Sequence, residues 1–336
     1  MEARTLTLGR NCLKRGYLAA ASLLLVLSFS MCPTSSSQSM PDLQARIDRA
    51  VGYLTKQFNP SLNLIYESDD PGKHWLTDEF ADFKWRYRQT YWLYSDNLFA
   101  AYALEPFRRD ISDRIKSALH RYPIPPSGLF EVVIGGHIPT IRNAVDYVVE
   151  PSTDYVIMAR RHDSSIVSYG LYADLMCYRA LQFFLYGKIH EAHRLFRQAI
   201  ALWSEKGLND WSFTMVDGFY SNQKLALLLY TSRVLMMNPA AFGDMERHLW
   251  AMQQRDGGVA ALSDAVGRPI GSSNTETTAL ALLIYNDSLI RLVQSKSRMI
   301  NESFTGFFAA SFLFLFATIA VLASRRRGVK SGSGGR

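Results

Sequence analysis

Apolar side chains recur every three or four positions through much of residues 42–300, which is the spacing of one face of an α-helix. Leu43, Ile47 and Leu54 show this pattern in the first segment, where Asp42 stands at the position of a helix cap. Proline, glycine or Asn-Pro pairs separate the segments. The pattern predicts helices at about 42–58, 95–107, 110–122, 171–185, 189–203, 219–237, 241–254 and 274–292.

Four segments share a second pattern, in which hydroxyl, amide or carboxylate groups come first and small or apolar residues follow on nearly every side. These segments begin at Tyr94, Tyr172, Tyr220 and Ser273. A helix that is apolar all round is surrounded by protein. We therefore predict four inner helices, most of them paired with an amphipathic helix in an antiparallel hairpin.

Two stretches lack this helical spacing. Residues 59–90 are polar and aromatic, and we predict a long ordered loop there. Residues 123–165 open with Pro-Ile-Pro-Pro-Ser-Gly and contain short β-branched runs separated by Gly, Pro or Asp. This second stretch is predicted to be a small β or extended insertion, with its runs at 129–134, 145–149 and 155–158.

The two ends of the chain have the composition of membrane-targeting segments. Residues 304–323 carry no charge and are followed by a basic tail at 324–336, which predicts one transmembrane helix with a cytoplasmic C-terminus. Residues 1–33 place cations before a short apolar run, as a signal peptide or a signal anchor does. Lipidation of Cys32 is the alternative. The prediction is a single-pass protein of the cell membrane, with the lipid bilayer as a partner, a linker at 34–41 and the 42–300 domain outside the cytoplasm.

Charge and cysteine content narrow the class of protein further. The net charge of +7 comes largely from the cationic termini, so the domain between them is close to neutral and gives no argument for nucleic acid as a partner. Cys177 is the one cysteine of the domain, which excludes a disulfide within it. The chain contains no nucleotide-binding glycine motif and no His-Glu-x-x-His pattern. We therefore expect neither a cofactor nor a metal.

The loop Gln253–Gly258, followed by the helical segment Ser272–Leu283, resembles the α/α-toroid superfamily. That superfamily includes six-hairpin glycosidases, terpenoid cyclases and protein prenyltransferases. Val259 replaces the aromatic residue of the cyclase motif, and the Asp-x-Asp-Asp run of proton-donating cyclases is absent. The resemblance implies a mainly α fold. The expected fold class is thus an α/α-hairpin toroid, complete or truncated, with a small β or extended insertion and one C-terminal transmembrane helix.

Carboxylates at the starts of the inner helices are the first candidates for catalysis. In a toroid these helix starts converge on one rim, so the acids at or beside them would come together although they are distant in sequence. These acids are Asp96, Asp174, Asp217 and Glu276. Glycoside hydrolysis needs such a pair of carboxyl groups, one as proton donor and one as base or nucleophile. The alternative is that each acid only caps its helix or stabilises its first turn.

Aromatic and polar neighbours of Asp96 predict a binding site for sugar rings. Trp92, Tyr94 and Asn97 lie within a stretch that offers stacking faces and hydrogen-bonding groups. The alternative is an aromatic core contact that closes the first hairpin.

Polar residues of two further segments complete the candidate site. His162 and Asp163 are adjacent and could exchange protons near neutral pH, with Arg160 as a ligand-binding neighbour. The alternative is a solvent-exposed polar loop. Asp256, in the glycine-rich loop, is the remaining candidate for ligand binding.

These features predict a carbohydrate-active protein at the cell surface, which hydrolyses or binds glycans through an acidic, aromatic cleft and resembles a glycoside hydrolase if it is an enzyme. The alternative is a non-catalytic helical-repeat domain that binds a surface protein or a peptide. Residues 187–203 are similar to half of a tetratricopeptide repeat, although a regular 34-residue period is absent.

Overall fold

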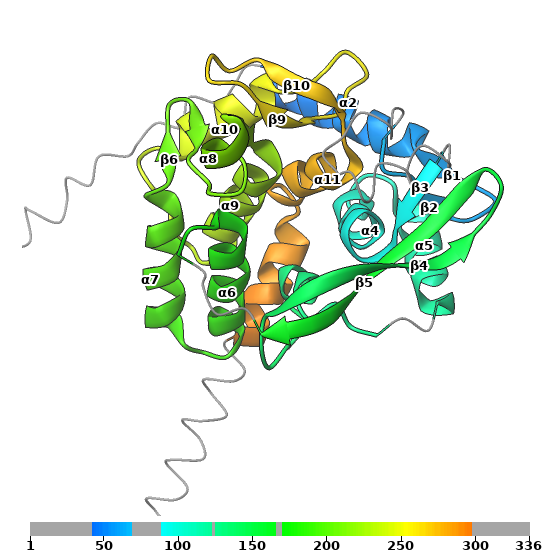
Figure 1. Cartoon of the computed structure of the whole chain (residues 1–336), viewed down its shortest axis with the longest axis horizontal. Coiled ribbons are helices and arrows are strands. Elements are labelled where there is room, and N and C mark those ends of the chain that lie inside the picture. The colour runs from blue at the N-terminus through cyan, green and yellow to red at the C-terminus, as the bar shows by residue number, and fades with distance from the viewer. Residues whose placement is uncertain (1–41, 69–88, 123–124, 166–169, 298–336) are drawn as a thin grey trace, which may run out of the picture. The chain divides into compact units, whose positions relative to one another are not determined.

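Inner helices α4, α6, α9 and α11 form the centre of the protein. The computed structural model describes residues 42–68, 89–122, 125–165 and 170–297. Figure 1 shows α11 between α4 and α9, and α9 also packs against α6. Almost every residue of α9 and α11 is buried, because alanine and leucine occupy all sides of these helices. The prediction of inner helices in these four segments is confirmed. Their bounds are Leu98–Leu104 for α4, Ala173–Leu185 for α6, Asn222–Val234 for α9 and Thr275–Leu283 for α11.

Amphipathic helices cover the inner ones. Helices α2, α5, α7 and α10 pack against α11, α4, α6 and α9, respectively. In α2 the buried side chains include Ile47, Ala50 and Leu54, which repeats the spacing seen in the sequence. Residues 287–297 form a further helix after α11. The bounds are Leu43–Lys56 for α2, Arg109–Arg121 for α5, Ile189–Ile200 for α7 and Phe242–Ala251 for α10.

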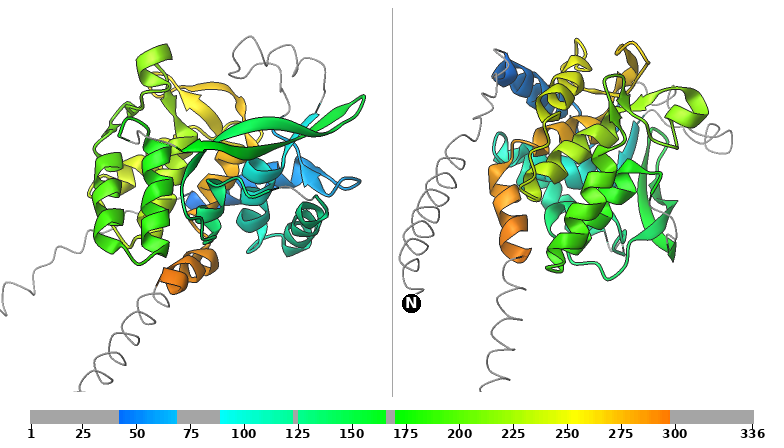
Figure 2. Two further views of the ribbon diagram at one scale, coloured as in Figure 1. Left: turned by 60° about the horizontal axis from the view of Figure 1, so that its bottom comes forward. Right: turned by 90° about the vertical axis from the view of Figure 1, so that its left-hand side faces the viewer.

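A three-stranded sheet contains the segment that was predicted to be extended. Strands β4 and β5 pair as a long antiparallel ribbon, which crosses the molecule in Figure 2, and β3 pairs with β5 in parallel. The register places Asp146 of β4 opposite Arg160 of β5, and Trp92 of β3 opposite Met158. The bounds are Gln89–Trp92 for β3, Arg142–Pro151 for β4 and Tyr155–Ser165 for β5.

Three smaller sheets and one short helix occupy the connections. Sheet β10-β9-β8 packs against the beginning of α9, and two-residue strands pair as β1 with β2 and as β6 with β7. The bounds are Phe58–Asn59 for β1, Leu64–Ile65 for β2, Trp203–Ser204 for β6, Gly207–Leu208 for β7, Thr214–Asp217 for α8, Tyr220–Ser221 for β8, Ala260–Ser263 for β9 and Pro269–Ser273 for β10.

This architecture corrects the predicted fold class. A mainly α-helical toroid is the wrong description, because only about half of the described part of the chain is helical and four small sheets join its helices. Strands of two residues are too short to show an alternating pattern, so they could not be predicted from the sequence. The run at 129–134 is a 3₁₀ helix, Phe130–Ile134, and not a strand.

The predicted transmembrane helix is not supported either. Within the ranges that the structure describes, no helix is long and apolar enough to cross a bilayer. The segments assigned to the signal sequence (1–33), the linker (34–41), the spanning helix (304–323) and the basic tail (324–336) lie outside those ranges.

The loop that connects α10 to β9 packs against the backbone of α2. Gly257 has a φ of +95°, and a Cβ atom at this position would lie 2.3 Å from the carbonyl oxygen of Arg49. The next residues anchor the start of α11, because Asn274 donates its N–H to the Val259 carbonyl and Val259 donates to Thr278 Oγ1. The loop therefore fixes the beginning of α11 relative to α2.

Gly257→Ala is expected to lower the free energy of unfolding by about 3 kcal/mol, because a strained backbone conformation is added to a steric clash. Urea denaturation monitored by circular dichroism measures this change. Gly267→Ala is the control: φ is +76° there, but a Cβ would meet no atom within 4 Å. We expect its cost to stay near about 1 kcal/mol, and equal losses in the two variants would contradict the role of the α2 contact.

Candidate functional site

A cleft of about 230 Å³ opens where three inner helices begin. Its walls come from the turn before α4, the first turns of α9 and α11, and strands β3, β4, β5 and β9. The cleft therefore collects residues that are up to about 200 positions apart in the sequence. It is lined by Glu67, Trp92, Ser95, Asp96, Asp146, Arg160, Phe213, Ser221, Gln223, Ala261, Leu262, Asn274 and Glu276.

A π-helical turn places Asp96 in this cleft. Residues Leu93–Asn97 form the turn between β3 and α4. Asn97 stabilises the turn through three hydrogen bonds. Its side-chain amide accepts one from the Ile65 N–H at 2.7 Å and donates to the carbonyls of Ile65 and Trp92 at 2.9 Å. Single π-helical turns occur often at functional sites, since they redirect one side chain out of the helical register.

Asp96 is a buried acid whose carboxyl group is only half satisfied. The residue is 1% exposed, and Oδ1 accepts a hydrogen bond from Ser95 Oγ at 2.9 Å. Oδ2 is buried without a hydrogen-bond partner among the residues described. Burial raises the pKa of Asp96 well above its ordinary value, and the nearby carboxylates Glu67 and Glu276 raise it further. The surroundings of Asp96 therefore favour the protonated form of its carboxyl group.

Glu276 stands in the first turn of α11, half-buried at the wall of the cleft. Its Oε1 accepts a hydrogen bond from Gln223 Nε2 at 2.8 Å. Burial raises the pKa of Glu276 to about 7, while Arg160 and the Gln223 hydrogen bond act in the opposite direction. Glu276 therefore changes its charge near neutral pH, in the same cleft where burial raises the pKa of Asp96.

Arg160 is the basic side chain among the residues that line the cleft. Its Nε lies 2.6 Å from Asp146 Oδ1 on the neighbouring strand, and its guanidinium carbon lies 5.1 Å from the ring centre of Trp92. The indole N–H of Trp92 donates to Glu67 Oε2 at 3.2 Å. Arg160 is thus held between a carboxylate and an aromatic face.

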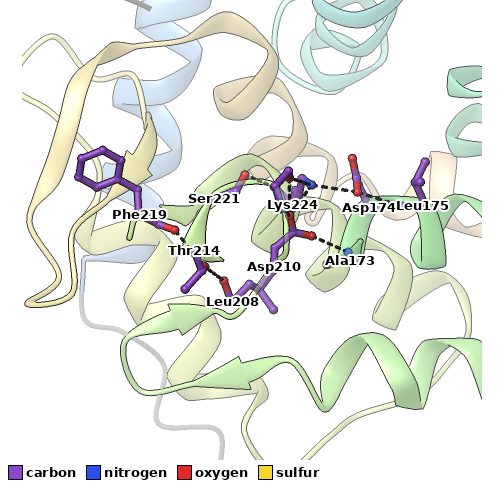
Figure 3. Close-up of polar contacts among 10 residues, drawn as sticks. Ala173, Asp174, Leu175, Leu208, Asp210, Thr214, Phe219, Ser221 and Lys224 are labelled. Atoms are coloured by element: carbon purple, nitrogen blue, oxygen red, sulfur yellow. Dashed lines mark hydrogen bonds and ion pairs between the residues drawn. The ribbon is translucent and has the colours of Figure 1, made fainter. Parts of the chain in front are cut away.

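A buried ionic cluster lies at the first turn of α9, which forms part of the cleft wall. Lys224 Nζ lies 2.8 Å from Asp210 Oδ1 and 3.1 Å from Asp174 Oδ1, and Asp210 is fully buried (Figure 3). Asp210 Oδ2 also accepts the backbone N–H of Ala173 at 2.8 Å. The cluster joins the first turns of α6 and α9, and it thereby fixes the position of Gln223, the neighbour of Lys224 that contacts Glu276.

The structure brings together four of the residues selected from the sequence. Asp96, Glu276, Trp92 and Arg160 all line the cleft. Helix capping does not account for the two acids, because Asn274 caps α11 through the N–H of Thr277 and Asp96 accepts no backbone cap hydrogen bond.

Four other predicted residues lie elsewhere, each for a local reason. Asp217 is exposed at the end of α8, where Gly218 turns the chain away. Asn97 braces the π-helical turn, and Tyr94 packs against the main hydrophobic core. Asp256 is exposed and orders its own loop by accepting hydrogen bonds from Gly258 N and Ser273 Oγ.

The predicted pair His162 and Asp163 falls in strand β5, in the part whose backbone alone is described. His162 pairs with Ala144 in the β4–β5 ladder, so the segment is a strand and not the polar loop that was the alternative. Their proposed proton exchange stays a prediction.

Sequence reasoning missed five polar residues of the cleft and of the ionic cluster beside it. Glu67 was hidden in a stretch without periodicity, and Gln223 and Lys224 were taken only as the start of an inner helix. Asp146 could have been found, because the hairpin register that pairs it with Arg160 follows from the two β-branched runs and the turn between them. Asp210 carried no local signal.

The lining of the cleft contains two carboxyl groups whose pKa values are raised, those of Asp96 and Glu276. In the described part of the chain, no group of three His, Cys, Asp or Glu side chains is arranged to hold a metal ion. Comparison with known protein families, with curated proteins and with solved structures found no match to this chain. Its function is therefore argued from the cleft itself.

Proposed function

We propose that the cleft is the active site of a carbohydrate-active enzyme that hydrolyses glycosidic bonds, with Asp96 as the general acid. One observation carries the proposal: Asp96 belongs to the lining of the cleft, and its Oδ2 is buried without a hydrogen-bond partner in the described part of the protein. An ionised oxygen would be costly in that position, whereas a protonated one offers an O–H donor to a ligand. A glycosidic oxygen is an acceptor that such a donor fits.

Glu276 supplies the base in this proposal. Asp96 transfers its proton to the glycosidic oxygen while the bond from that oxygen to the anomeric carbon breaks. A water molecule adds to the anomeric carbon and gives a proton to ionised Glu276. Transfer of that proton back to Asp96 through solvent then restores both groups.

The remaining walls of the cleft suit a sugar ring. Trp92 and Phe213 present aromatic side chains, and Gln223 and Asn274 present amide groups, as in sites that combine stacking with hydrogen bonds to hydroxyls. Arg160 adds a fixed donor that is already oriented by Asp146. These groups come from different elements, so the cleft keeps its shape only in the folded protein.

The pH dependence of glycan hydrolysis tests the proposal. Because Glu276 must be ionised to act as the base and its pKa is about 7, kcat is expected to fall about tenfold per pH unit below pH 7. Release of reducing ends from a panel of neutral and charged oligosaccharides, followed between about pH 5 and pH 9, provides the profile.

Gln223→Leu tests whether the fall in kcat below pH 7, which is the acidic limb of the profile, is caused by protonation of Glu276. It removes the hydrogen bond that favours the ionised carboxylate, so the limb should move up by about half a pH unit to one unit. Gln44→Leu, on the exposed face of α2, is the matched control and should leave the profile unchanged. A limb near the ordinary pKa of a glutamate, or one that Gln223→Leu does not move, would remove Glu276 from the mechanism. Absence of turnover for every glycan at every pH would contradict the proposal as a whole.

A further inference from the structure

Arg160 reaches the cleft from the β4–β5 ribbon. Side chains alternate along a strand, so Arg160 shares the face of β5 that carries Met158, which packs with Trp92 in a small apolar cluster. Arg161 points to the opposite face, where its guanidinium carbon lies 5.8 Å from the ring centre of Tyr147. Of these two neighbouring arginines, only Arg160 belongs to the lining of the cleft.

Three contacts hold the guanidinium group of Arg160 in place. Its Nε donates a hydrogen bond to Asp146 Oδ1 at 2.6 Å, across the β4–β5 ladder. Its central carbon lies 5.1 Å from the ring centre of Trp92 and 5.5 Å from that of Phe130. Because the side chain is still 32% exposed, these contacts fix the group without covering it. The directions of its two terminal nitrogens, Nη1 and Nη2, are therefore set before a ligand binds.

The terminal nitrogens of Arg160 carry hydrogen-bond donors that the described part of the protein does not use. All but one of the N–H groups of an arginine are on Nη1 and Nη2. No described residue accepts a hydrogen bond from either nitrogen, whereas Nε is bonded to Asp146. Oriented donors at the wall of a cleft, without a protein acceptor, can be satisfied by a ligand or by water.

The two acids of the proposed mechanism do not take up these donors. Burial raises the pKa of Asp96 and of Glu276, and the charge of Arg160 opposes the rise in both, so Arg160 acts on both acids across the cleft. Within the described ranges, the hydrogen bonds that the two acids accept on their side chains come from Ser95 and Gln223 instead. Arg160 thus influences both acids through its charge while its terminal donors stay directed at the cleft.

From this arrangement we infer that Nη1 and Nη2 of Arg160 bind two adjacent hydroxyl oxygens of a neutral sugar ring, and that Arg160 thereby determines which glycans the cleft accepts. The inference rests on the proposed function and adds the class of substrate, which is a neutral glycan whose bound ring has two adjacent free hydroxyl groups. The planar fork of a guanidinium group presents parallel N–H donors, which fit two neighbouring oxygen atoms.

A carboxylate would fit the same fork, but it would oppose the proposed reaction. Glu276 must be ionised to act as the base, and a further negative charge bound to Arg160 would raise the pKa of Glu276. Asp146 already places one carboxylate 2.6 Å from Arg160. A pair of hydroxyl groups uses the same donors without adding a charge.

Binding of trisaccharides to the full chain, measured by isothermal titration calorimetry, tests this inference. The neutral probes are the methyl glycosides of cellotriose, maltotriose and mannotriose, each compared with the analogue that lacks the 3-hydroxyl group in every ring and so has no adjacent pair of free hydroxyls. Trigalacturonate is the carboxylate probe. In the wild-type protein, the tightest-binding neutral probe should lose at least about tenfold in affinity on removal of these hydroxyls, as expected for hydrogen bonds to a charged group.

Arg160→Gln should reduce this difference between parent and 3-deoxy probe to less than about threefold, because the fork that distinguishes them is absent. Arg161→Gln is the matched control on the neighbouring position of the same strand, and it should retain the wild-type difference. If Arg160→Gln does not fold, Arg160→Lys gives the same comparison. It keeps the positive charge but has no planar fork, so the difference should fall severalfold.

Several outcomes would overturn the inference and leave the proposed hydrolase intact. One is equal binding of parent and 3-deoxy probes to the wild-type protein, and another is an equal difference in the wild type and the Arg160 variant. Tightest binding of trigalacturonate, lost in Arg160→Gln, would assign a carboxylate to the fork. Failure of the neutral probes to bind while other glycans are turned over would also contradict the inference. Failure of every probe to bind, together with absence of turnover across the wider glycan panel, would refute the proposed function as well.

Discussion

Replacing Asp96 by asparagine is expected to lower kcat for glycan hydrolysis by about 10³, within the range of about 10²–10⁴ that removal of a general acid costs. The asparagine keeps the size of the side chain and can still accept the hydrogen bond from Ser95 at the position of Oδ1. It has no acidic proton to transfer to the leaving oxygen. Because the stacking and hydrogen-bonding walls are unchanged, KM should change much less than kcat.

The same variant should be more stable than the wild-type protein at neutral pH. Burial raises the pKa of Asp96 in the folded state well above its ordinary value, so the folded protein binds this proton more tightly than the unfolded chain does. The free energy of unfolding of the wild type therefore decreases as the pH rises from about 4 through the folded-state pKa. Asparagine removes this penalty, so the free energy of unfolding of Asp96→Asn should exceed that of the wild-type protein at pH 7.

Initial rates and urea denaturation at about pH 5 and pH 8 separate the two effects. The wild-type protein should be more sensitive to this change in pH than Asp96→Asn is. Asp217→Asn is the matched control, because Asp217 is exposed outside the cleft and its loss should alter neither kcat nor stability. If Asp96→Asn retains kcat within a factor of ten, the assignment of the general acid is wrong. An equal pH dependence in the two proteins would show that Asp96 is ionised in the folded state.

Sequence reasoning found Asp96 and Glu276 because both lie where a polar start meets an apolar helix. The sequence alone could not show whether each acid caps its helix or faces a cleft, since both roles favour the same residue types at the same positions. The structure separates them through the neighbours. Asn274 and Ser221 cap their helices, with hydrogen bonds from Thr277 N and Lys224 N, and this leaves Glu276 to face the cleft.

The helices could be predicted because their periodicity is local, whereas the sheets depend on contacts between distant segments. Strand β3 pairs with β5 although about 60 residues separate them, and no spacing in either segment specifies that partner. Glu67 enters the cleft through hydrogen bonds of its backbone to Thr90 and Thr275, which a reading of residues 59–90 alone does not contain. The helix starts that carry Asp96 and Glu276 could thus be predicted from the sequence. The β3–β5 pairing and the position of Glu67 could not.

Lys224→Met is expected to lower the free energy of unfolding by about 3–5 kcal/mol, which is the cost of leaving one partner of a buried ion pair uncompensated. Asp210 is fully buried and would lie beside an apolar side chain in place of the ammonium group, although Ala173 N and Ser212 N still donate to it. Two neighbouring carboxylates, Asp174 and Asp210, would then lack the cation between them.

Urea denaturation measures this loss of stability, and Arg247→Met provides the control. Arg247 pairs with Asp244 on the exposed face of α10, where loss of an ion pair costs less than about 1 kcal/mol. A loss below about 1 kcal/mol for Lys224→Met would show that the cluster does not hold α6 and α9 together. If the cluster does position the first turn of α9, the variant should also move the acidic limb of the pH profile upward, because Gln223 would no longer be held against Glu276. A change in stability without a change in that limb would separate the support of the fold from the tuning of Glu276.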